Sequence, residues 1–221
     1  MQTGLFNIRQ AKQDEAATIA RLIMTAMTDE CCLFFCGKEY GIDSFHRVMT
    51  RLVEREDSQY SYKNTLCAVD WQDNIAGICT SYDGGKLRQL RQMFIDTALK
   101  EWGKDHSGIP DETEAGELYI DSLAVDPAFR GKGIATMLLN ATIEKAKKLG
   151  LPRTGLLVDT GNPRAEALYN RVGFKLAGTN AWGGHPMRHL VVQHIQDSWK
   201  SYAYQNTLRR KHLNSKETQN I

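Results

Sequence analysis

A short glycine-rich stretch, RGKGIA from Arg130 to Ala135, combines residue types that could hold an anion. Glycines at 131 and 133 let the backbone come close to a ligand, and the first amide N–H groups of a helix have no acceptor within that helix. The charges of Arg130 and Lys132 favour the same kind of guest, as does the helix dipole. This pattern indicates a phosphate or pyrophosphate site.

Other interpretations of the same stretch are an ordinary turn or a different nucleotide-binding loop. A lone Gly-x-Gly also occurs in turns that bind nothing. The stretch is not a P-loop, because Gly-Lys is not followed by Ser or Thr, and it lacks the third glycine of the Gly-x-Gly-x-x-Gly dinucleotide motif. An anion site at a strand-to-helix junction therefore needs support from the neighbouring elements.

Those elements are visible in the hydrophobic pattern. Residues 118–125 are aromatic, branched and apolar, which predicts a strand. From Ile134 the apolar residues recur at helical spacing, and Gly150 ends the predicted helix. The glycine-rich stretch thus lies between a strand and the first turn of a helix.

In this arrangement the sequence resembles the GNAT family of acetyl-CoA-dependent N-acetyltransferases. Arg130, Gly133 and Ala135 match the family signature Arg/Gln-x-x-Gly-x-Gly/Ala in register. A second family element of strand, helix and Gly-Phe is expected about thirty residues later, and LLVDTGNPRAEALYNRVGF, residues 156–174, supplies it. The resemblance covers about residues 117–192.

The resemblance implies a mixed α/β (α+β) fold. Its central, mostly antiparallel twisted sheet has about seven strands, is flanked by helices on both faces, and is splayed between strands 4 and 5. We expect a single GNAT domain over residues 1–194, followed by a polar tail or docking helix over 195–221.

The implied reaction is transfer of an acetyl group from acetyl-CoA to a primary amine by direct attack in a ternary complex. The strand backbone at Leu123 and Val125 would meet the pantetheine arm and the thioester. The residues that the resemblance implies for coenzyme binding are Leu123, Ala124, Val125, Arg130, Gly131, Lys132, Gly133, Ile134, Ala135, Asn162 and Tyr169.

Before any bulge, alternation along the central strand places Glu117, Tyr119, Asp121 and Leu123 on one face. Family members often carry an acidic residue near the bulge of this strand, so the resemblance implies Asp121 as the general base and Glu117 as the second candidate. Glu117 and Tyr119 would also contact the acceptor. The alternative for Asp121 is a carboxylate that binds the ammonium group without moving a proton.

Tyr169 stands where family members place the tyrosine that protonates the coenzyme A thiolate. A phenol is neutral at pH 7 and can donate to sulfur without leaving a buried charge. An ordinary core tyrosine is the alternative. Asn162 followed by Pro163 predicts a helix N-cap, to which the resemblance adds a possible coenzyme contact.

The composition gives no general attraction to polyanions. The 221 residues include 28 Lys and Arg against 26 Asp and Glu, a net charge of +2, which offers no argument for nucleic acid or an anionic membrane. No apolar run approaches the length of a membrane span, and the start lacks a signal-peptide apolar region. We expect a cytoplasmic protein with no nucleic-acid or membrane partner.

Neither the cysteines nor the histidines predict a metal site. The five cysteines, Cys31, Cys32, Cys36, Cys67 and Cys79, lack Cys-x-x-Cys pairs and are expected to be buried free thiols. His185, His189 and His194 could suggest a metal set, but His185 and His189 would lie roughly 13 Å apart on a strand at about 3.3 Å per residue, too far for one ion. We expect no metal.

The remaining segments predict further strands and helices. Strands are expected over residues 5–9, 65–70, 74–82, 154–159, 174–177 and 185–192, and helices over about 16–27, 42–53 and 87–102. The last of these helices, within residues 86–116, departs from the family's minimal pattern. The acidic residues between 103 and 116 would either attract an amine or simply be solvated.

The acceptor is the least determined part. In the resemblance, Cys31 to Tyr40 joins two helices beside the acceptor pocket, although ordinary packing by Leu33, Phe34 and Phe35 explains it equally well. The acceptor could be a small-molecule amine or an amine of a peptide. The sequence also leaves open whether the protein forms a homodimer. The rival functions are a non-catalytic acyl-CoA sensor or scaffold and an acyltransferase that uses another acyl-CoA.

Overall fold

The computed structural model describes residues 5–182 and 185–194, so the predicted tail at 195–221 lies outside the described residues. The order of the strands and α-helices matches most of the predicted elements. In chain order they are β1 (Asn7–Gln10), α1 (Ala16–Met27), α2 (Asp29–Cys36), α3 (Gly41–Glu54), β2 (Thr65–Val69), β3 (Ile75–Asp83), α4 (Leu87–Trp102), β4 (Glu117–Val125), α5 (Ile134–Lys148), β5 (Arg153–Asp159), α6 (Pro163–Val172), β6 (Lys175–Trp182) and β7 (His185–Gln193).

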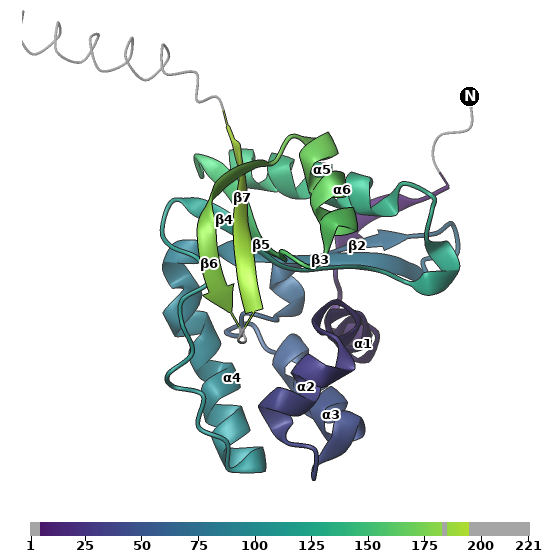
Figure 1. The fold of residues 1–221 in the computed structure, drawn as a ribbon. Helices are drawn as coiled ribbons and strands as arrows, with labels where there is room; N and C mark the ends of the chain where they lie inside the picture. The colour runs from purple at the N-terminus through teal and green to yellow at the C-terminus, as the bar shows by residue number, and fades with distance from the viewer. Residues whose placement is uncertain (1–4, 183–184, 195–221) are drawn as a thin grey trace, which may run out of the picture.

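The strands form one seven-stranded sheet in the order β1-β2-β3-β4-β5-β7-β6 (Figure 1). Neighbouring strands are antiparallel except for β4 and β5, which are parallel. A parallel pair needs a long crossover, and α5 supplies it. The predicted mostly antiparallel mixed sheet is confirmed.

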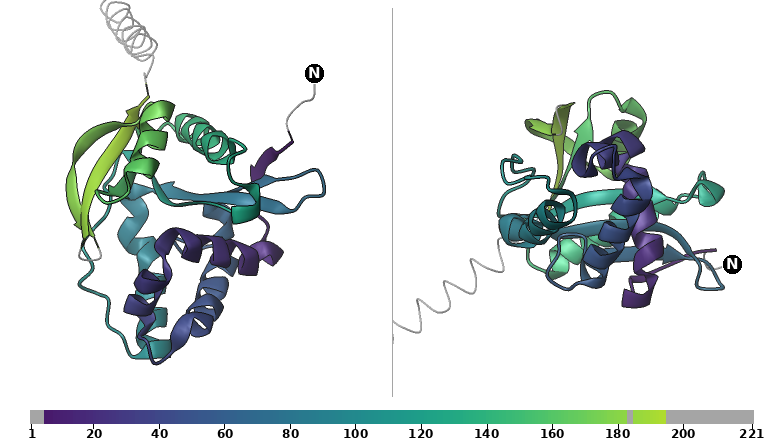
Figure 2. Two further views of the ribbon diagram at one scale, coloured as in Figure 1. Left: turned by 45° about the vertical axis from the view of Figure 1, so that its right-hand side comes forward. Right: turned by 90° about the horizontal axis from the view of Figure 1, so that it is seen from below.

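Helices cover both faces of the sheet, with α5 and α6 on one face and α1 to α4 on the other (Figure 2). Strand alternation separates two cores, because Cys67 of β2 joins the core of α1 and α3 while the next residue, Ala68, joins the core of α5. Phe45 in the first core and Leu138 in the second are fully buried. Each such side chain contributes about 1.5–3 kcal/mol of burial free energy.

The parallel strands β4 and β5 separate after a short ladder. They pair only from Glu117–Arg153 to Ile120–Leu156, although β4 continues to Val125 and β5 to Asp159. On its other side β4 stays paired with β3, with one register shift that leaves Asp121 as the extra residue of a bulge. A bulge bends its strand and increases the local twist, so the separation has a local cause. The predicted opening between strands 4 and 5 is confirmed.

A buried carboxylate ties the strands together where they are still paired. The Glu117 side chain is fully buried and accepts hydrogen bonds from Thr113, Arg153 and His189. Gly155 leaves room for it, since a Cβ there would overlap the Glu117 carboxylate and the His189 ring. The network links β4, β5 and β7 at the start of the paired segment, whose other end is the opening.

The predicted connection at residues 31–40 is wrong over its first part, which lies in helix α2. The Thr28 hydroxyl accepts a hydrogen bond from the Cys31 amide (3.4 Å), and two acidic residues occupy the first turn, where the helix dipole favours them. Gly37, with a φ of +89°, ends the helix. Thr28 as an N-cap and Gly37 as a helix end are the sequence signals that indicate helix α2.

Two strand boundaries also differ from the prediction. β6 continues past residue 177 because its pairing with β7 runs from Lys175–Val191 to Trp182–His185. β1 starts at Asn7 and not at residue 5, because its ladder with β2 begins at the pair Asn7–Val69. Both boundaries are set by the partner strand.

The added helix α4 and the acidic loop after it form a charge-balanced unit. Arg91 of α4 is buried and pairs with Asp111 and Glu112. Glu112 is only 5% exposed, and its other oxygen accepts a hydrogen bond from the Tyr82 hydroxyl (3.1 Å). A simply solvated loop is therefore wrong for Glu112.

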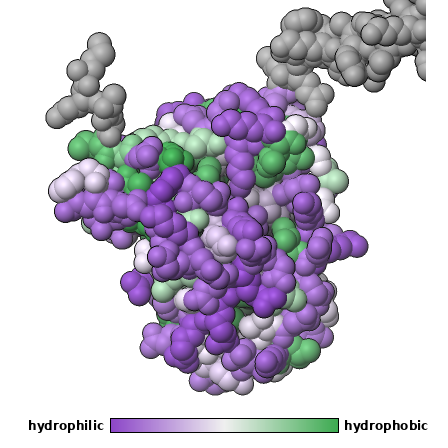
Figure 3. Space-filling view, turned by 180° about the vertical axis from the view of Figure 1, so that it is seen from behind, coloured by the Kyte–Doolittle hydropathy of each residue, from purple (hydrophilic) through white to green (hydrophobic). Residues whose placement is uncertain are grey.

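The face of the molecule that Figure 3 presents has the surface expected of a protein whose apolar side chains are mostly buried. That face is mainly hydrophilic, and its hydrophobic residues form small separate patches. Over residues 5–182 and 185–194, no helix has the length and apolar character needed to cross a membrane.

We predict that Gly155→Ala lowers the free energy of unfolding by about 1–3 kcal/mol, because the added methyl group must displace a buried carboxylate. Urea denaturation followed by circular dichroism measures this. The matched control is Gly178→Ala in β6, where a Cβ meets nothing within 4 Å and φ is not left-handed. Equal stability of the two variants would contradict the assigned role of Gly155.

Candidate active site

Two glycines give the turn before α5 a backbone that other residues rarely adopt. Gly131 has a φ of +77° and Gly133 a φ of +79°, and Gly133 directly precedes the helix. In the part of the chain that the structure describes, the amides of residues 131–133 have no backbone acceptor. The turn therefore offers free N–H groups at the positive end of a helix dipole.

Two cationic side chains flank these amides. The Arg130 Nε donates to the Val125 carbonyl (3.3 Å), which ties the turn to the end of β4. The Lys132 ammonium lies 5.2 Å from the centre of the Phe129 ring. Both cationic side chains are exposed, so an anion at the start of α5 would meet amides and two positive charges.

The backbone of Leu123, Ala124 and Val125 lies on the part of β4 that has left β5. It pairs with β3 on one side, and among the described residues it has no strand partner on the side of β5. Within the described part of the chain, the end of β5, residues 157–159, likewise pairs only with β7. Two facing strand edges of this kind can accept an extended molecule as a short extra strand.

Asp121, the bulge residue, lies beside this opening and is partly buried. Its Oδ2 accepts a hydrogen bond from the Ser122 hydroxyl (2.8 Å), and its Oδ1 accepts one from Gln59 Nε2 (3.4 Å). Burial, followed by the charge of Glu112, raises the pKa of Asp121 to about 7. A carboxyl group with this pKa can take up and release a proton near neutral pH.

Buried tyrosines surround the Asp121 side of the sheet. Burial, and after it the charge of Asp121, raises the pKa of Tyr60 and of Tyr82 well above the usual range. These phenols therefore stay neutral at pH 7 and add no charge beside Asp121. The carbonyl oxygen of Gln59 is buried without a hydrogen-bond partner among the described residues.

Tyr169 lies on the other face of the sheet, where it packs in the core beneath α5 with Leu123. Its ring centre is 5.9 Å from that of Phe174. Burial, followed by the nearby Cys79 thiol, raises the pKa of Tyr169 to about 12, so the phenol carries its proton at neutral pH. Tyr169 and Asp121 thus approach the opening from opposite faces.

Asn162 caps helix α6, as predicted. Its Oδ1 accepts a hydrogen bond from the Ala165 amide (3.1 Å), and Pro163 follows at the first helical position. A coenzyme contact from Asn162 stays a prediction.

The structure does not bring Glu117 and Tyr119 to an accessible surface. Burial alone would raise the pKa of Glu117, but hydrogen bonds from His189 and Thr113 hold it below the usual value. Tyr119 is 5% exposed and packs against Tyr82. Both side chains are enclosed by protein groups, so the acceptor contact predicted for them lacks an exposed surface.

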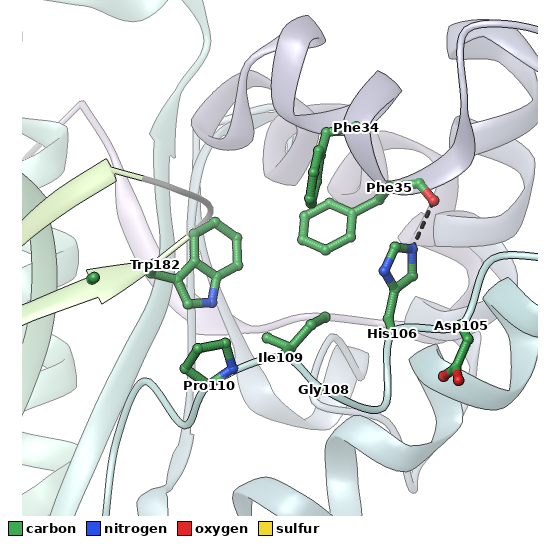
Figure 4. A pocket seen from close by; sticks show the side chains of 9 residues that line it. Phe34, Phe35, Asp105, His106, Gly108, Ile109, Pro110 and Trp182 are labelled. Carbon is green, nitrogen blue, oxygen red and sulfur yellow. Dashed lines mark hydrogen bonds between the residues drawn. The ribbon is translucent and has the colours of Figure 1, made fainter.

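A cavity of about 420 Å³ lies on the α2 side of the molecule (Figure 4). Phe34 and Phe35 of α2, His106 and Ile109 of the loop after α4, and Trp182 of β6 line it. The sequence had singled out the two phenylalanines, but no local pattern links them to residues 106 and 182. These lining residues meet only through the tertiary fold.

The histidines considered for metal binding have separate partners. His189 contacts Glu117, His194 contacts Thr154 and His185 lies near Asp159. No group of three or more metal-ligating side chains gathers within the described residues.

Comparison with known proteins gives a consistent set of relatives. A mycothiol acetyltransferase from Propionibacterium freudenreichii is 38% identical over 81 residues, which are 36% of this chain and 24% of that protein. An acetyltransferase from Agrobacterium fabrum is 42% identical over 72 residues, 33% of this chain and 51% of that protein. The chain thus spans about a quarter to a half of the length of these curated relatives.

Solved structures match nearly the whole described fold. A crystal structure of an acetyltransferase has a TM-score of 0.71 and 28% identity, and the match covers 85% of this chain and 98% of that chain. An N-acetyltransferase from Staphylococcus aureus Mu50 has a TM-score of 0.70 and 26% identity, with 84% and 100% coverage.

Residues 38–174, more than half of the chain, match the acetyltransferase (GNAT) family. This match includes the glycine-rich turn, the parted strands and Tyr169. The chain therefore belongs to the GNAT family of acetyltransferases.

Proposed function

We propose that this protein transfers an acetyl group from acetyl-CoA to a primary amine by direct attack in a ternary complex. The observation that carries the proposal is the unpaired edge of β4 at residues 121–125, which lies between a carboxyl group of pKa about 7 and a helix start with free amides. Membership of the GNAT family supports the same reaction.

The residues present fit the co-substrate in charge and hydrogen-bonding capacity. The free amides of the turn at 131–133, with Arg130 and Lys132, would hold the pyrophosphate. The open edge of Leu123 to Val125 would pair with the amide groups of the pantetheine arm. When bound, acetyl-CoA supplies a thioester as the acetyl donor.

In this proposal, Asp121 acts as the proton acceptor and Tyr169 as the proton donor. Asp121 accepts a proton from the ammonium group, so that the neutral nitrogen can form a C–N bond with the thioester carbon. A backbone N–H of β4 donates to the carbonyl oxygen as negative charge develops there. Tyr169 donates its hydroxyl proton to sulfur as the C–S bond breaks. The second proton of the attacking nitrogen leaves to water, from which the Tyr169 phenolate recovers a proton, so the products are an amide, a free thiol and protonated Asp121.

Direct attack also fits the state of the cysteines. Burial, followed by the charge of Asp121, raises the pKa of Cys31 to about 11, although this is the most accessible of the five thiols. A thiol that stays protonated at neutral pH is a poor nucleophile. A covalent acetyl-cysteine route has no suitable group here.

We predict that Tyr169→Phe slows release of coenzyme A about 100-fold, because the departing sulfur loses its proton donor. Thiol release from acetyl-CoA with a panel of primary amines measures the rate, and calorimetry should give nearly unchanged coenzyme affinity. Tyr62→Phe is the control, since its hydroxyl bonds only Glu56 among the described residues (3.1 Å). A fully active Tyr169→Phe would contradict the assigned role, and a wild type inactive with every amine would contradict the function.

We predict that the acetylation rate rises as the pH increases through about 7, because Asp121 must lose its proton before it can act as a base. Asp121→Asn should lower the rate about 100-fold and remove this inflection. The control Asp96→Asn changes an exposed carboxylate on α4 and should keep both. An unchanged inflection in Asp121→Asn would exclude Asp121 as the titrating group.

The same pKa predicts an opposite effect on stability. The native state binds the Asp121 proton more tightly than the unfolded state, whose carboxyl has the ordinary pKa of 3.8, so wild-type stability falls as the pH rises from about 4 to about 7. Asparagine does not ionise, so the stability of Asp121→Asn should not fall over this pH range. We expect this variant to unfold at a higher urea concentration than the wild type at pH 8.

We predict that Gly133→Ala weakens coenzyme A binding about tenfold or more, because the alanine strains the turn that presents the amides. The matched control is Gly150→Ala at the other end of α5, which has a φ of +71° and equally open surroundings. Both variants should lose similar stability. Calorimetry should find the loss of affinity only in Gly133→Ala, and equal affinities would argue against this turn as the pyrophosphate site.

A further inference from the structure

The segment between α3 and β2 reaches Asp121 and is buried, although it is neither helix nor strand. Gln59 is 3% exposed, and its neighbours Ser58 and Ser61 are fully buried. Loops usually run over the surface, because their backbone groups need water or another partner. This buried segment therefore depends on the protein itself for its hydrogen bonds.

The backbone of Gln59 is held on both sides. Its amide N–H donates to the Leu90 carbonyl of α4 (3.2 Å), and its carbonyl oxygen accepts a hydrogen bond from Asn64 Nδ2 (3.2 Å). The same Asn64 nitrogen also donates to the Ser58 carbonyl (3.1 Å). The Gln59 side chain thus starts from a fixed backbone position.

The side-chain amide of Gln59 is paired at one end only. Its Nε2 donates to Asp121 Oδ1 at 3.4 Å, slightly longer than the usual range. Its Oε1 is buried and has no hydrogen-bond donor within residues 5–182 and 185–194. Buried polar atoms normally have a partner, so an unpaired oxygen beside the proposed base needs a physical reason.

Ser122 distinguishes the two oxygens of the Asp121 carboxyl group. Its hydroxyl donates to Oδ2 (2.8 Å), so Oδ2 acts as an acceptor. A neutral carboxyl group has one O–H donor, and its other oxygen accepts. Because Ser122 occupies Oδ2 as a donor, the proton belongs on Oδ1, the oxygen that faces Gln59. The Gln59 NH2 group can only donate, so in its present orientation it does not suit an O–H group.

A side-chain amide can suit both states by turning over. Its NH2 group and its oxygen occupy nearly the same space, so a half-turn about the last side-chain bond exchanges them with little change of shape. After the half-turn, Gln59 Oε1 accepts a hydrogen bond from the Oδ1–H group of Asp121. The turn costs Oε1 no hydrogen bond, because it has none among the described residues at present.

Almost all titratable groups around the Asp121 carboxyl are neutral at pH 7. Within the part of the chain that the structure describes, the groups that interact with its charge are Cys31 of α2, Tyr60, Cys79 and Tyr82 of β3, Glu112 of the loop after α4, and Tyr119 of β4. Burial is the main cause that raises the pKa of each of these thiols and phenols. Glu112 is paired with Arg91 (3.2 Å). The direct hydrogen-bond partners of the carboxyl are thus the neutral groups of Gln59 and Ser122.

We propose that Gln59 is a positioning residue for Asp121: its amide donates to the carboxylate and, turned over, accepts the proton that Oδ1 holds after it has left the amine. Both protonation states of the proposed base are then held in the same place. The inference rests on the proposed acetyl transfer and names the group that keeps its base in position.

The direct test follows the side-chain NH2 signals of Gln59 by NMR in the isotope-labelled full chain as the pH is raised. We expect them to move downfield with a midpoint at about pH 7, because Nε2 becomes the donor to the carboxylate. This movement should be absent in Asp121→Asn. The control is Gln10, whose Nε2 donates to the backbone carbonyls of Tyr62 and Thr65 and whose signals should lack this midpoint.

Kinetics test the consequence for the reaction. Gln59→Met keeps the side-chain length but removes the donor, so the midpoint of kcat/KM against pH should rise by about one unit, and kcat/KM at pH 7 should fall about fivefold. KM for acetyl-CoA should stay within about twofold of the wild type. The matched control Gln92→Met removes an amide that donates to the exposed Asp96 (2.8 Å), and it should keep both the midpoint and the rate.

The outcomes separate the role of Gln59 from the reaction itself. Gln59 signals that stay flat around pH 7 in the wild type, or a Gln59→Met midpoint equal to that of the wild type, would overturn the proposal. If no amine is acetylated, the proposed function fails and the NMR titration decides the role of Gln59. A movement that Asp121→Asn abolishes would then support it, and flat signals would refute it. The same titration decides if Gln59→Met does not fold.

Discussion

The early end of the β4–β5 ladder is the constraint on which the rest of the structure depends. Beyond the pair Ile120–Leu156, two strands of one sheet keep their outer partners but lose each other. Backbone groups inside a protein normally pair, so this edge calls for a partner. The bulge at Asp121 turns β4 away, and the buried Glu117 network holds the paired part closed. The position at which the opening begins is therefore set by the bulge and by the paired segment before it.

A charged side chain in the loop after α4, Glu112, affects the pKa of Asp121 beside this opening. Arg91 pairs with Glu112, and that buried pair lies close enough for the Glu112 charge to act on Asp121. Because burial and a like charge both disfavour the ionised form, the Asp121 carboxyl is poised near neutral pH. The added helix and the loop after it, whose role the sequence left in doubt, thus contribute to the properties of the proposed base and also wall the aromatic cavity.

Local sequence signals predicted the parts of the site that depend on neighbours along the chain. The turn at Gly131 and Gly133 before a helix and the Asn162 cap follow from single residues and their immediate context. The family resemblance then predicted the opening between strands 4 and 5. Helix α2 was missed because its N-cap at Thr28 follows the end of α1 without a connecting segment.

Features that depend on distant residues were not predictable in the same way. Strand alternation placed Glu117 on the face of Asp121, but only the tertiary fold brings Arg153 and His189 to its carboxylate and closes it from solvent. The raised pKa of Asp121 likewise needs Glu112, which stands nine residues earlier in a loop. The cavity joins side chains from α2, the loop after α4 and β6, and no spacing rule connects these segments.

The most direct test of the central claim is hydrogen exchange of the backbone amides with and without coenzyme A, read residue by residue by NMR. We predict that coenzyme A slows exchange in two stretches, at residues 122–125 of β4 and at 131–135 before and within the first turn of α5. Slower exchange at only one of these stretches, at neither, or at a different edge of the sheet would contradict it.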